Sequence, residues 1–188
     1  MKKLNYALLL TIGTALFLVS YKFDDQVNIF FGNTSLVFFD FIMRLVTNFW
    51  IVLFVMLVIP SFMSYKKDKR LIYLFLLAFF ASFVLAFVLK LIVARPRPFE
   101  TLAFPFTNMP DYSFPSIHSM VAFSLLPALV RHLPKQKIFW VVFAFLVGFS
   151  RIYFGVHFLS DVVFGAIAGY LIGHFLLGLH EKGKLWAK

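Results

Sequence analysis

The chain has 188 residues, of which 62% are hydrophobic and 14% charged, and its mean hydropathy is +0.90. Soluble domains average about 45–50% apolar and about 25% charged residues, so this composition excludes an ordinary soluble domain. The length predicts a single domain, residues 1–188, without repeats or low-complexity linkers. The absence of cysteine excludes disulfides and thiolate metal sites.

Apolar stretches long enough to cross a bilayer follow one another along the chain. A spanning helix needs roughly 20 apolar residues, and the sequence offers six such stretches, at about residues 4–21, 45–64, 71–93, 115–131, 138–155 and 158–179. The first follows a short basic segment, as a signal peptide does, but no small-x-small cleavage pattern precedes Lys22. We therefore expect an all-α, polytopic membrane protein with six transmembrane helices.

The distribution of charge predicts the orientation of these helices. Short loops rich in Lys and Arg stay in the cytoplasm, so both termini are expected there. The cytoplasmic flanks would carry two acids, Asp68 and Glu181, and the whole formal charge of +10 through twelve basic residues: Lys2, Lys3, Lys66, Lys67, Lys69, Arg70, Arg131, Lys135, Lys137, Lys182, Lys184 and Lys188. Because this charge is spread over four flanks and forms no single stripe, no nucleic-acid partner is expected.

A second set of basic residues does not follow this rule. Four cations lie where apolar segments meet the opposite, external loops: Lys90, Arg95, Arg97 and Arg151. Charge at membrane depth is costly and usually functional. We therefore expect an anion to be held at the external ends of the helices, while simple snorkelling of Lys90 remains an equal alternative for that residue alone.

Two of the candidate groups lie on either side of the second external loop, at the end of one expected helix and at the start of the next. Lys90 precedes Arg97 by seven residues, two helical turns, so both cations would share one side if the helix continued. Ser116 fits the cap of a helix whose first N–H groups can bind an anion. His118 would lie in the first turn of that helix, where it could give or take a proton; a capped helix with an incidental histidine is the alternative.

The third motif pairs an imidazole with a carboxylate. Arg151 lies at one expected helix end, and His157 and Asp161 stand four residues apart at the start of the next. One helical turn places the carboxylate on the side of the imidazole. There it would fix the tautomer and leave the other ring nitrogen as base or nucleophile. A mutually satisfied His–Asp pair in the bundle interior is the alternative for an isolated pair.

Taken together, these side chains suit a phosphate group. Lys90, Arg97 and Arg151 match its non-bridging oxygens, and stabilising charge on such oxygens is the main task in phosphoryl transfer. One histidine can attack phosphorus while the other protonates the departing oxygen. No acidic pair or His cluster with ligand spacing occurs, so neither a metal nor another cofactor is expected.

The three motifs resemble the tripartite signature of the type 2 phosphatidic acid phosphatase family. They read Lys90-x6-Arg97-Pro98, Pro115-Ser116-x-His118 and Ser150-Arg151-x5-His157-x3-Asp161. The resemblance implies that His157 is the nucleophile, which forms a phosphohistidine. It also implies that Asp161 orients His157 and that His118 is the general acid.

The resemblance further implies a set of phosphate-binding residues: Lys90, Arg97, Ser116, Ile117 and Arg151. Ile117 stands where the family usually has glycine. If this position contributes only its backbone N–H, isoleucine can bind the phosphate as glycine would. If the family glycine needs positive φ or a close approach, the pocket differs in shape.

The resemblance implies a lipid substrate as well. The chain is similar to bacterial enzymes of the cytoplasmic membrane whose active site faces the periplasm. Such enzymes remove a phosphate from a lipid of the outer leaflet, and no obligate protein partner is expected. Lipid A 1-phosphate or undecaprenyl diphosphate is expected first, and phosphatidylglycerol phosphate or phosphatidate is the alternative. A transporter and an inactive lipid-binding relative are alternatives of other classes. Transporters often have repeated halves, and an inactive relative would be expected to lack one of the two histidines.

A glycine pattern marks the last expected helix. Gly165, Gly169 and Gly173 recur at four-residue spacing. Small residues at this spacing let two helices approach closely in a membrane. We expect close packing inside the bundle, with dimerisation as the less favoured use.

Overall fold

The computed structural model describes residues 6–32, 37–66, 68–98, 102–103 and 110–185. Over these residues the chain is mostly helical, and the short strands β1 (Leu102–Ala103) and β2 (Pro110–Asp111) pair antiparallel. Lys2, Lys3, Lys67 and Lys188, four of the predicted cytoplasmic charges, lie outside the described residues.

Two bent helix pairs form the first part of the fold. α1 (Tyr6–Lys22) meets α2 (Asp24–Gly32) at a bend of 57°. α3 (Val37–Thr47) meets α4 (Phe49–Leu53) at a bend of 66°, and the π-helical turn η1 (Phe54–Val58) and α5 (Ile59–Tyr65) continue α4. The second bend falls inside the expected stretch 45–64. Asn48 explains it, because its side chain accepts hydrogen bonds from Trp50 N at 3.0 Å and Ile51 N at 3.3 Å and starts a new helix.

The remaining helices build the core around a central helix. α6 (Lys69–Val93), α7 (Ile117–His132), α8 (Lys137–Tyr153) and α9 (Leu159–Glu181) pack together, and the 3-10 turn η2 (Pro134–Gln136) links α7 to α8. Every residue of α7 from Ser119 to Leu129 is buried. α7 is therefore covered by protein on all sides along that length.

Glycine lets α9 lie directly against the backbone of α7. A Cβ atom at Gly169 would lie 2.1 Å from Met120 O, and one at Gly173 would lie 1.9 Å from Ser124 O. Real Cβ atoms essentially never come closer than 3.0 Å to another heavy atom. The close packing expected from the glycine spacing is thus confirmed.

Length and hydropathy support fewer spans than the sequence predicts. Three described helical segments are long and apolar enough to cross a membrane, Lys69–Val93, Pro134–Tyr153 and Leu159–Glu181, and the two bent pairs would raise the number to five. α7, in the region of the fourth expected span, has only 16 residues. At 1.5 Å per residue it is shorter than the hydrocarbon core of about 30 Å. Six spans therefore remain a prediction.

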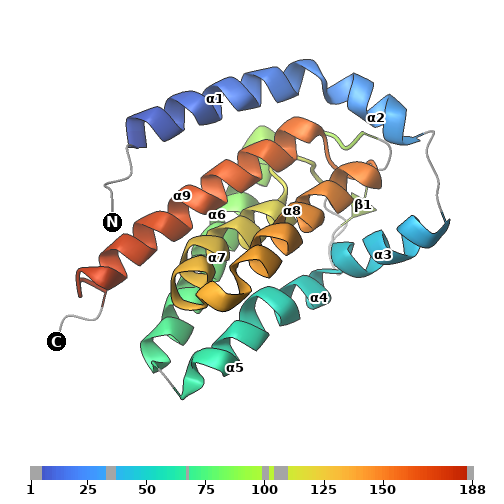
Figure 1. The fold of residues 1–188 in the computed structure, drawn as a ribbon. Coiled ribbons are helices and arrows are strands. Elements are labelled where there is room, and N and C mark those ends of the chain that lie inside the picture. The colour runs from blue at the N-terminus through green and yellow to red at the C-terminus, as the bar shows by residue number, and fades with distance from the viewer. Residues whose placement is uncertain (1–5, 33–36, 67, 99–101, 104–109, 186–188) are drawn as a thin grey trace.

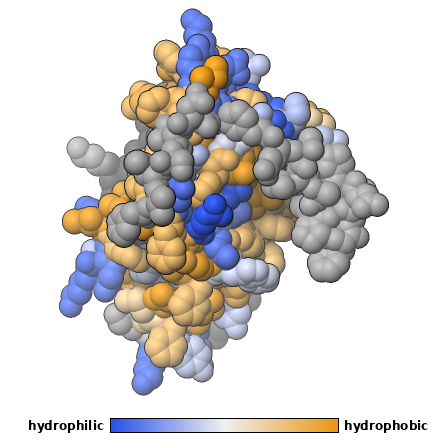
Figure 2. Space-filling model, turned by 90° about the vertical axis from the view of Figure 1, so that its right-hand side faces the viewer, coloured by the Kyte–Doolittle hydropathy of each residue, from blue (hydrophilic) through white to orange (hydrophobic). Residues whose placement is uncertain are grey.

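The arrangement gives the bundle two distinct ends. The start of α1 and the end of α9 lie at one end, and the α8–α9 connection lies at the other (Figure 1). α1 runs along α9 in the opposite direction, so that a Cβ atom at Gly13 would lie 3.0 Å from Ile167. Figure 2 views the end with the α8–α9 connection and shows hydrophilic surface near its centre, bordered by apolar surface.

Candidate active site

The end of α6 supplies the first cation. Lys90 lies in the last turn and is only 2% exposed, and its Nζ donates a hydrogen bond to Tyr112 O. α6 then stops at Ala94, which has a left-handed backbone (φ 49°, ψ 37°) and donates its N–H to Lys90 O. This conformation costs an alanine roughly 1–2 kcal/mol. The chain leaves the helix there and carries Arg95 and Arg97 away from the axis of α6.

Arg97 reaches the α8–α9 connection. Its Nη1 donates to Val156 O and lies 3.3 Å from His157 Nε2. A guanidinium is only a donor, so this contact assigns a lone pair to Nε2 and the ring proton of neutral His157 to Nδ1. Nε2 of His157 therefore presents its lone pair to the Arg97 guanidinium.

The start of α7 lies beside this pair. Ser116 caps the helix, with its Oγ accepting from Ser119 N at 3.4 Å, and its own N–H donates to Asp161 O at 3.2 Å. Ile117 is the first helical residue and does not have positive φ, so its backbone conformation suits any L-amino acid. A positive-φ requirement for glycine at this position does not apply to this chain.

His118 lies in the first turn of α7. Its ring is 5.2 Å from the ring of Phe49, centroid to centroid. Its Nε2 is buried and has no hydrogen-bond partner among the described residues. Arg151, His157 and Arg97 all act on it electrostatically. An imidazole nitrogen thus remains available for proton transfer next to the cations.

The end of α8 supplies the third cation. Arg151 Nη1 donates to Thr47 Oγ1, and its backbone O accepts from His157 N at 3.3 Å. Thr47 is the last residue of α3, 104 positions away in the chain. The bend between α3 and α4 therefore helps to hold Arg151 in place.

Asp161 faces the other ring nitrogen of His157. Its Oδ2 lies 3.6 Å from His157 Nδ1, just beyond hydrogen-bonding distance. The same Oδ2 accepts from Phe158 N at 2.9 Å and from Ser113 Oγ. The carboxylate is fully buried. A small closure would bring it into hydrogen-bonding distance of Nδ1.

The surroundings of His157 favour its neutral form. Its burial, with 1% of its surface exposed, is the main cause, and the charges of Arg151, Arg97 and Lys90 add to it. Together they lower the pKa of His157 well below its usual value near 6.5. A neutral imidazole keeps the lone pair that a nucleophile needs.

Comparison with known sequences decides the family. Residues 69–184, more than half of the chain, match the PAP2 superfamily. The chain belongs to the PAP2 superfamily. The family expected from the three motifs is thereby confirmed, and the matched segment contains all of the motif residues.

Individual PAP2 relatives agree with this assignment. Phosphatidylglycerophosphatase B of Bacillus subtilis is 39% identical over 122 residues, which cover 59% of each chain. Undecaprenyl-diphosphatase BcrC of the same organism is 31% identical over 140 residues, 71% of each chain. The chain thus spans about three-fifths of the length of the first of these relatives.

A solved PAP2 structure shares the whole fold. The transmembrane PAP2-type phosphatidylglycerolphosphate phosphatase from Bacillus subtilis superposes with a TM-score of 0.74 at 28% identity, and the match covers 96% of this chain and 98% of the other. With the apolar helices described above, this identifies a multi-pass membrane protein of the all-helical PAP2 type.

The PAP2 motifs do not account for every residue that builds the site. Arg95, whose role the sequence leaves open, donates to Asp161, and Asp24 of α2 accepts from Arg95. Arg95 is one of the four cations that the sequence places at the expected external helix ends, so its charge pointed to a functional role. Asp24 carried no such signal, because its partners lie 71 and 136 positions away.

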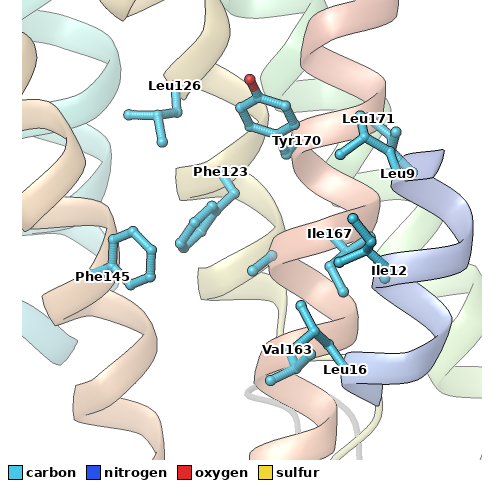
Figure 3. Close-up of a pocket in the computed structure, with 12 residues that line it drawn as sticks. Leu9, Ile12, Leu16, Phe123, Leu126, Phe145, Val163, Ile167, Tyr170 and Leu171 are labelled. Atoms are coloured by element: carbon cyan, nitrogen blue, oxygen red, sulfur yellow. The ribbon is translucent and has the colours of Figure 1, made fainter. Parts of the chain in front are cut away.

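A separate apolar groove lies between helices of the PAP2 bundle (Figure 3). It has a volume of about 420 Å³ and lies between α1, α7, α8 and α9, with Leu16, Phe123 and Ile167 among its lining residues. None of the motif side chains lines it. The groove is therefore distinct from the cluster of cations and histidines.

Proposed function

We propose that this protein is a phosphatase that removes a phosphate from a membrane lipid through a phosphohistidine at His157. The observation that carries the proposal is the pair of contacts on one ring: Arg97 Nη1 lies 3.3 Å from Nε2, and Asp161 Oδ2 lies 3.6 Å from Nδ1. This arrangement aims a lone pair at the cations and a proton at the carboxylate. A nucleophile for a bound phosphate needs that tautomer.

In the first step, His157 Nε2 attacks phosphorus. The N–P bond forms as the bond to the lipid oxygen breaks, and His118 protonates that oxygen. Lys90, Arg97 and Arg151 hold the non-bridging oxygens, together with the Ser116 hydroxyl and the backbone N–H of Ile117 at the start of α7. Asp161 stabilises the positive charge that develops on the imidazole.

In the second step, water completes the hydrolysis. His118, now neutral, takes a proton from water as the water oxygen attacks phosphorus. The N–P bond breaks, inorganic phosphate leaves, and His157 returns to its starting form. Each histidine therefore ends the cycle as it began, and the chemistry balances without an added cofactor.

We propose a lipid phosphate or diphosphate as substrate because the site lies at the ends of apolar helices. The names of the two Bacillus relatives favour phosphatidylglycerol phosphate and undecaprenyl diphosphate. Lipid A 1-phosphate and phosphatidate complete the set of candidates. The site would face the periplasm of a bacterial cytoplasmic membrane, with both termini in the cytoplasm, as the charge pattern predicts.

The test is phosphate release from these four lipids by purified protein in detergent, with and without a chelator. His157→Ala should lower kcat by on the order of 10³-fold or more, because it removes the nucleophile. Asp161→Asn should lower it by about 10- to 100-fold, because it disturbs only the orientation. The chelator should have no effect.

A matched control is available on the same helix. His174 lies on α9 near Tyr170, beside a different pocket, so His174→Ala should retain wild-type turnover. Equal phosphate release by wild type and His157→Ala would refute the phosphohistidine. No release from any of the four lipids by a folded wild-type protein would refute the function and favour the transporter alternative.

A further inference from the structure

Arg95 lies between two buried carboxylates. Its Nη1 is 2.8 Å from Asp161 Oδ1, and its Nη2 is 2.8 Å from Asp24 Oδ2. Nη1 also donates to Ser160 Oγ at 2.8 Å. The side chains of Asp24 and Asp161 are 5% and 0% exposed, so both charges would be costly without this cation.

Asp24 joins this cluster from outside the segment that matches the PAP2 superfamily. It lies in the first turn of α2, and its Oδ1 accepts from Ser160 N at 2.8 Å while its Oδ2 accepts from Ser160 Oγ at 2.6 Å. Ser160 belongs to the first turn of α9, whose N–H groups have no partner within the helix. Asp24 therefore holds the start of α9 and one arm of Arg95 at once.

The guanidinium also lies over two aromatic rings. Its Cζ lies 3.8 Å from the ring centroid of Phe158 and 5.4 Å from that of Tyr21. Such cation–π contacts stabilise and orient an arginine plane. With two carboxylates at its nitrogens and two aromatic rings in contact with it, Arg95 is directed toward the carboxylate that faces His157.

Arg95 holds one of the two oxygens of the Asp161 carboxylate. Oδ1 accepts from Arg95, whereas Oδ2 accepts from Phe158 N and Ser113 Oγ and faces His157 Nδ1. Loss of the Oδ1 contact would leave the carboxylate held through Oδ2, with less to fix its rotation. It would also leave Asp24 and Asp161 buried together without the cation between them.

We propose that Arg95 is a positioning residue for the phosphatase reaction, anchored by Asp24 and acting through Asp161, and that it does not bind the phosphate. The inference rests on the proposed function, since it assigns a role within that reaction. It joins α2 to the catalytic cluster through a partly buried ion pair, Arg95–Asp24, in which neither residue belongs to a PAP2 motif.

The test compares kinetics of variants on a lipid phosphate that the wild type hydrolyses, with inorganic phosphate as inhibitor. Arg95→Met should lower kcat by about 10- to 100-fold, because a misplacement of a catalytic group by about 1 Å can cost about 10²-fold in rate. KM and the inhibition constant of inorganic phosphate should stay within about threefold, because the phosphate contacts are intact. Arg95→Lys, which can still pair with a carboxylate, should restore part of the turnover.

A double variant tests whether Arg95 acts through Asp161. Arg95→Met combined with Asp161→Asn should lose no more than about threefold beyond Asp161→Asn alone, because coupled residues are not additive. Multiplied losses would overturn the proposal. So would a tenfold weaker inhibition by phosphate in Arg95→Met, which would make Arg95 a phosphate ligand. An active wild type with an equally active Arg95→Met would refute this inference alone, whereas an inactive wild type would refute the proposed function.

Asp24→Asn provides a second test if Arg95→Met does not fold. Its amide oxygen can still accept from Ser160, but the charge that anchors Arg95 is gone. We expect a several-fold lower kcat at unchanged KM. Asp25→Asn is the matched control, because Asp25 is the exposed neighbour in the same turn of α2. Equal turnover in the two folded Asn variants would overturn the anchoring role of Asp24.

Discussion

The contact between α7 and α9 predicts that Gly173→Ala will destabilise the protein. The added Cβ would lie 1.9 Å from Ser124 O and 2.8 Å from the carbonyl carbon, both backbone atoms of a buried helix. Ordinary C···O contacts are about 3.3 Å or longer, so α7 and α9 would have to part by more than an ångström. No flexible side chain is present at this point to relieve the clash.

The expected cost follows from two opposing effects. Overpacking a well-packed interior costs about 1–3 kcal/mol or more, and the better helix propensity of alanine returns up to about 1 kcal/mol. A net loss of about 2 kcal/mol corresponds to a melting temperature lower by about 4–8 °C for a chain of this size. The assay is thermal unfolding of the purified protein in one detergent, followed by circular dichroism.

Gly178→Ala is the matched control. It lies on the same helix, and a Cβ there would meet no atom within 4 Å. Alanine should therefore leave the melting temperature unchanged or raise it, since only the helix propensity changes. If Gly173→Ala melts together with wild type and Gly178→Ala, the packing argument for the glycine spacing is refuted.

Two further predictions concern acid and topology. The unfolded chain takes up a proton on His157 below about pH 6.5, whereas the lowered pKa keeps this residue neutral in the folded protein. The free energy of unfolding should therefore fall as the pH drops from 7 to 5. The melting temperature of His157→Asn should fall less than that of the wild type over the same range. Because the chain has no cysteine, single cysteines report topology cleanly: in intact cells an impermeant maleimide should label Lys22→Cys and not Lys135→Cys, and the opposite pattern would reverse the predicted orientation.

The general character of the protein follows from local sequence patterns. Hydrophobic stretches of about 20 residues predict membrane helices, and the motif spacing identifies the family, as the match to residues 69–184 confirms. Both features depend on residues close together in the chain. Hydropathy does not fix the number of spans, because a buried helix such as α7 can be short where protein covers it instead of lipid.

The sequence also located the unusual charges without dividing their tasks. Lys90, Arg95, Arg97 and Arg151 all stood at helix ends that the charge pattern predicts to be external. Only the structure distinguishes Arg95, which bridges two carboxylates, from Arg97, which contacts His157 Nε2. A cation two residues from another in a proline-rich segment has no periodicity that predicts which way it points.

What the sequence by itself determined is the membrane character, the family and the motif residues that lie near the candidate site. What only the tertiary structure decided is how the site is held: Thr47 against Arg151 across 104 positions, and Asp24 against Arg95 across 71. The physical reason is that caps, helical spacing and hydropathy act over a few residues. A buried ion pair depends instead on which helices pack together and how each one bends.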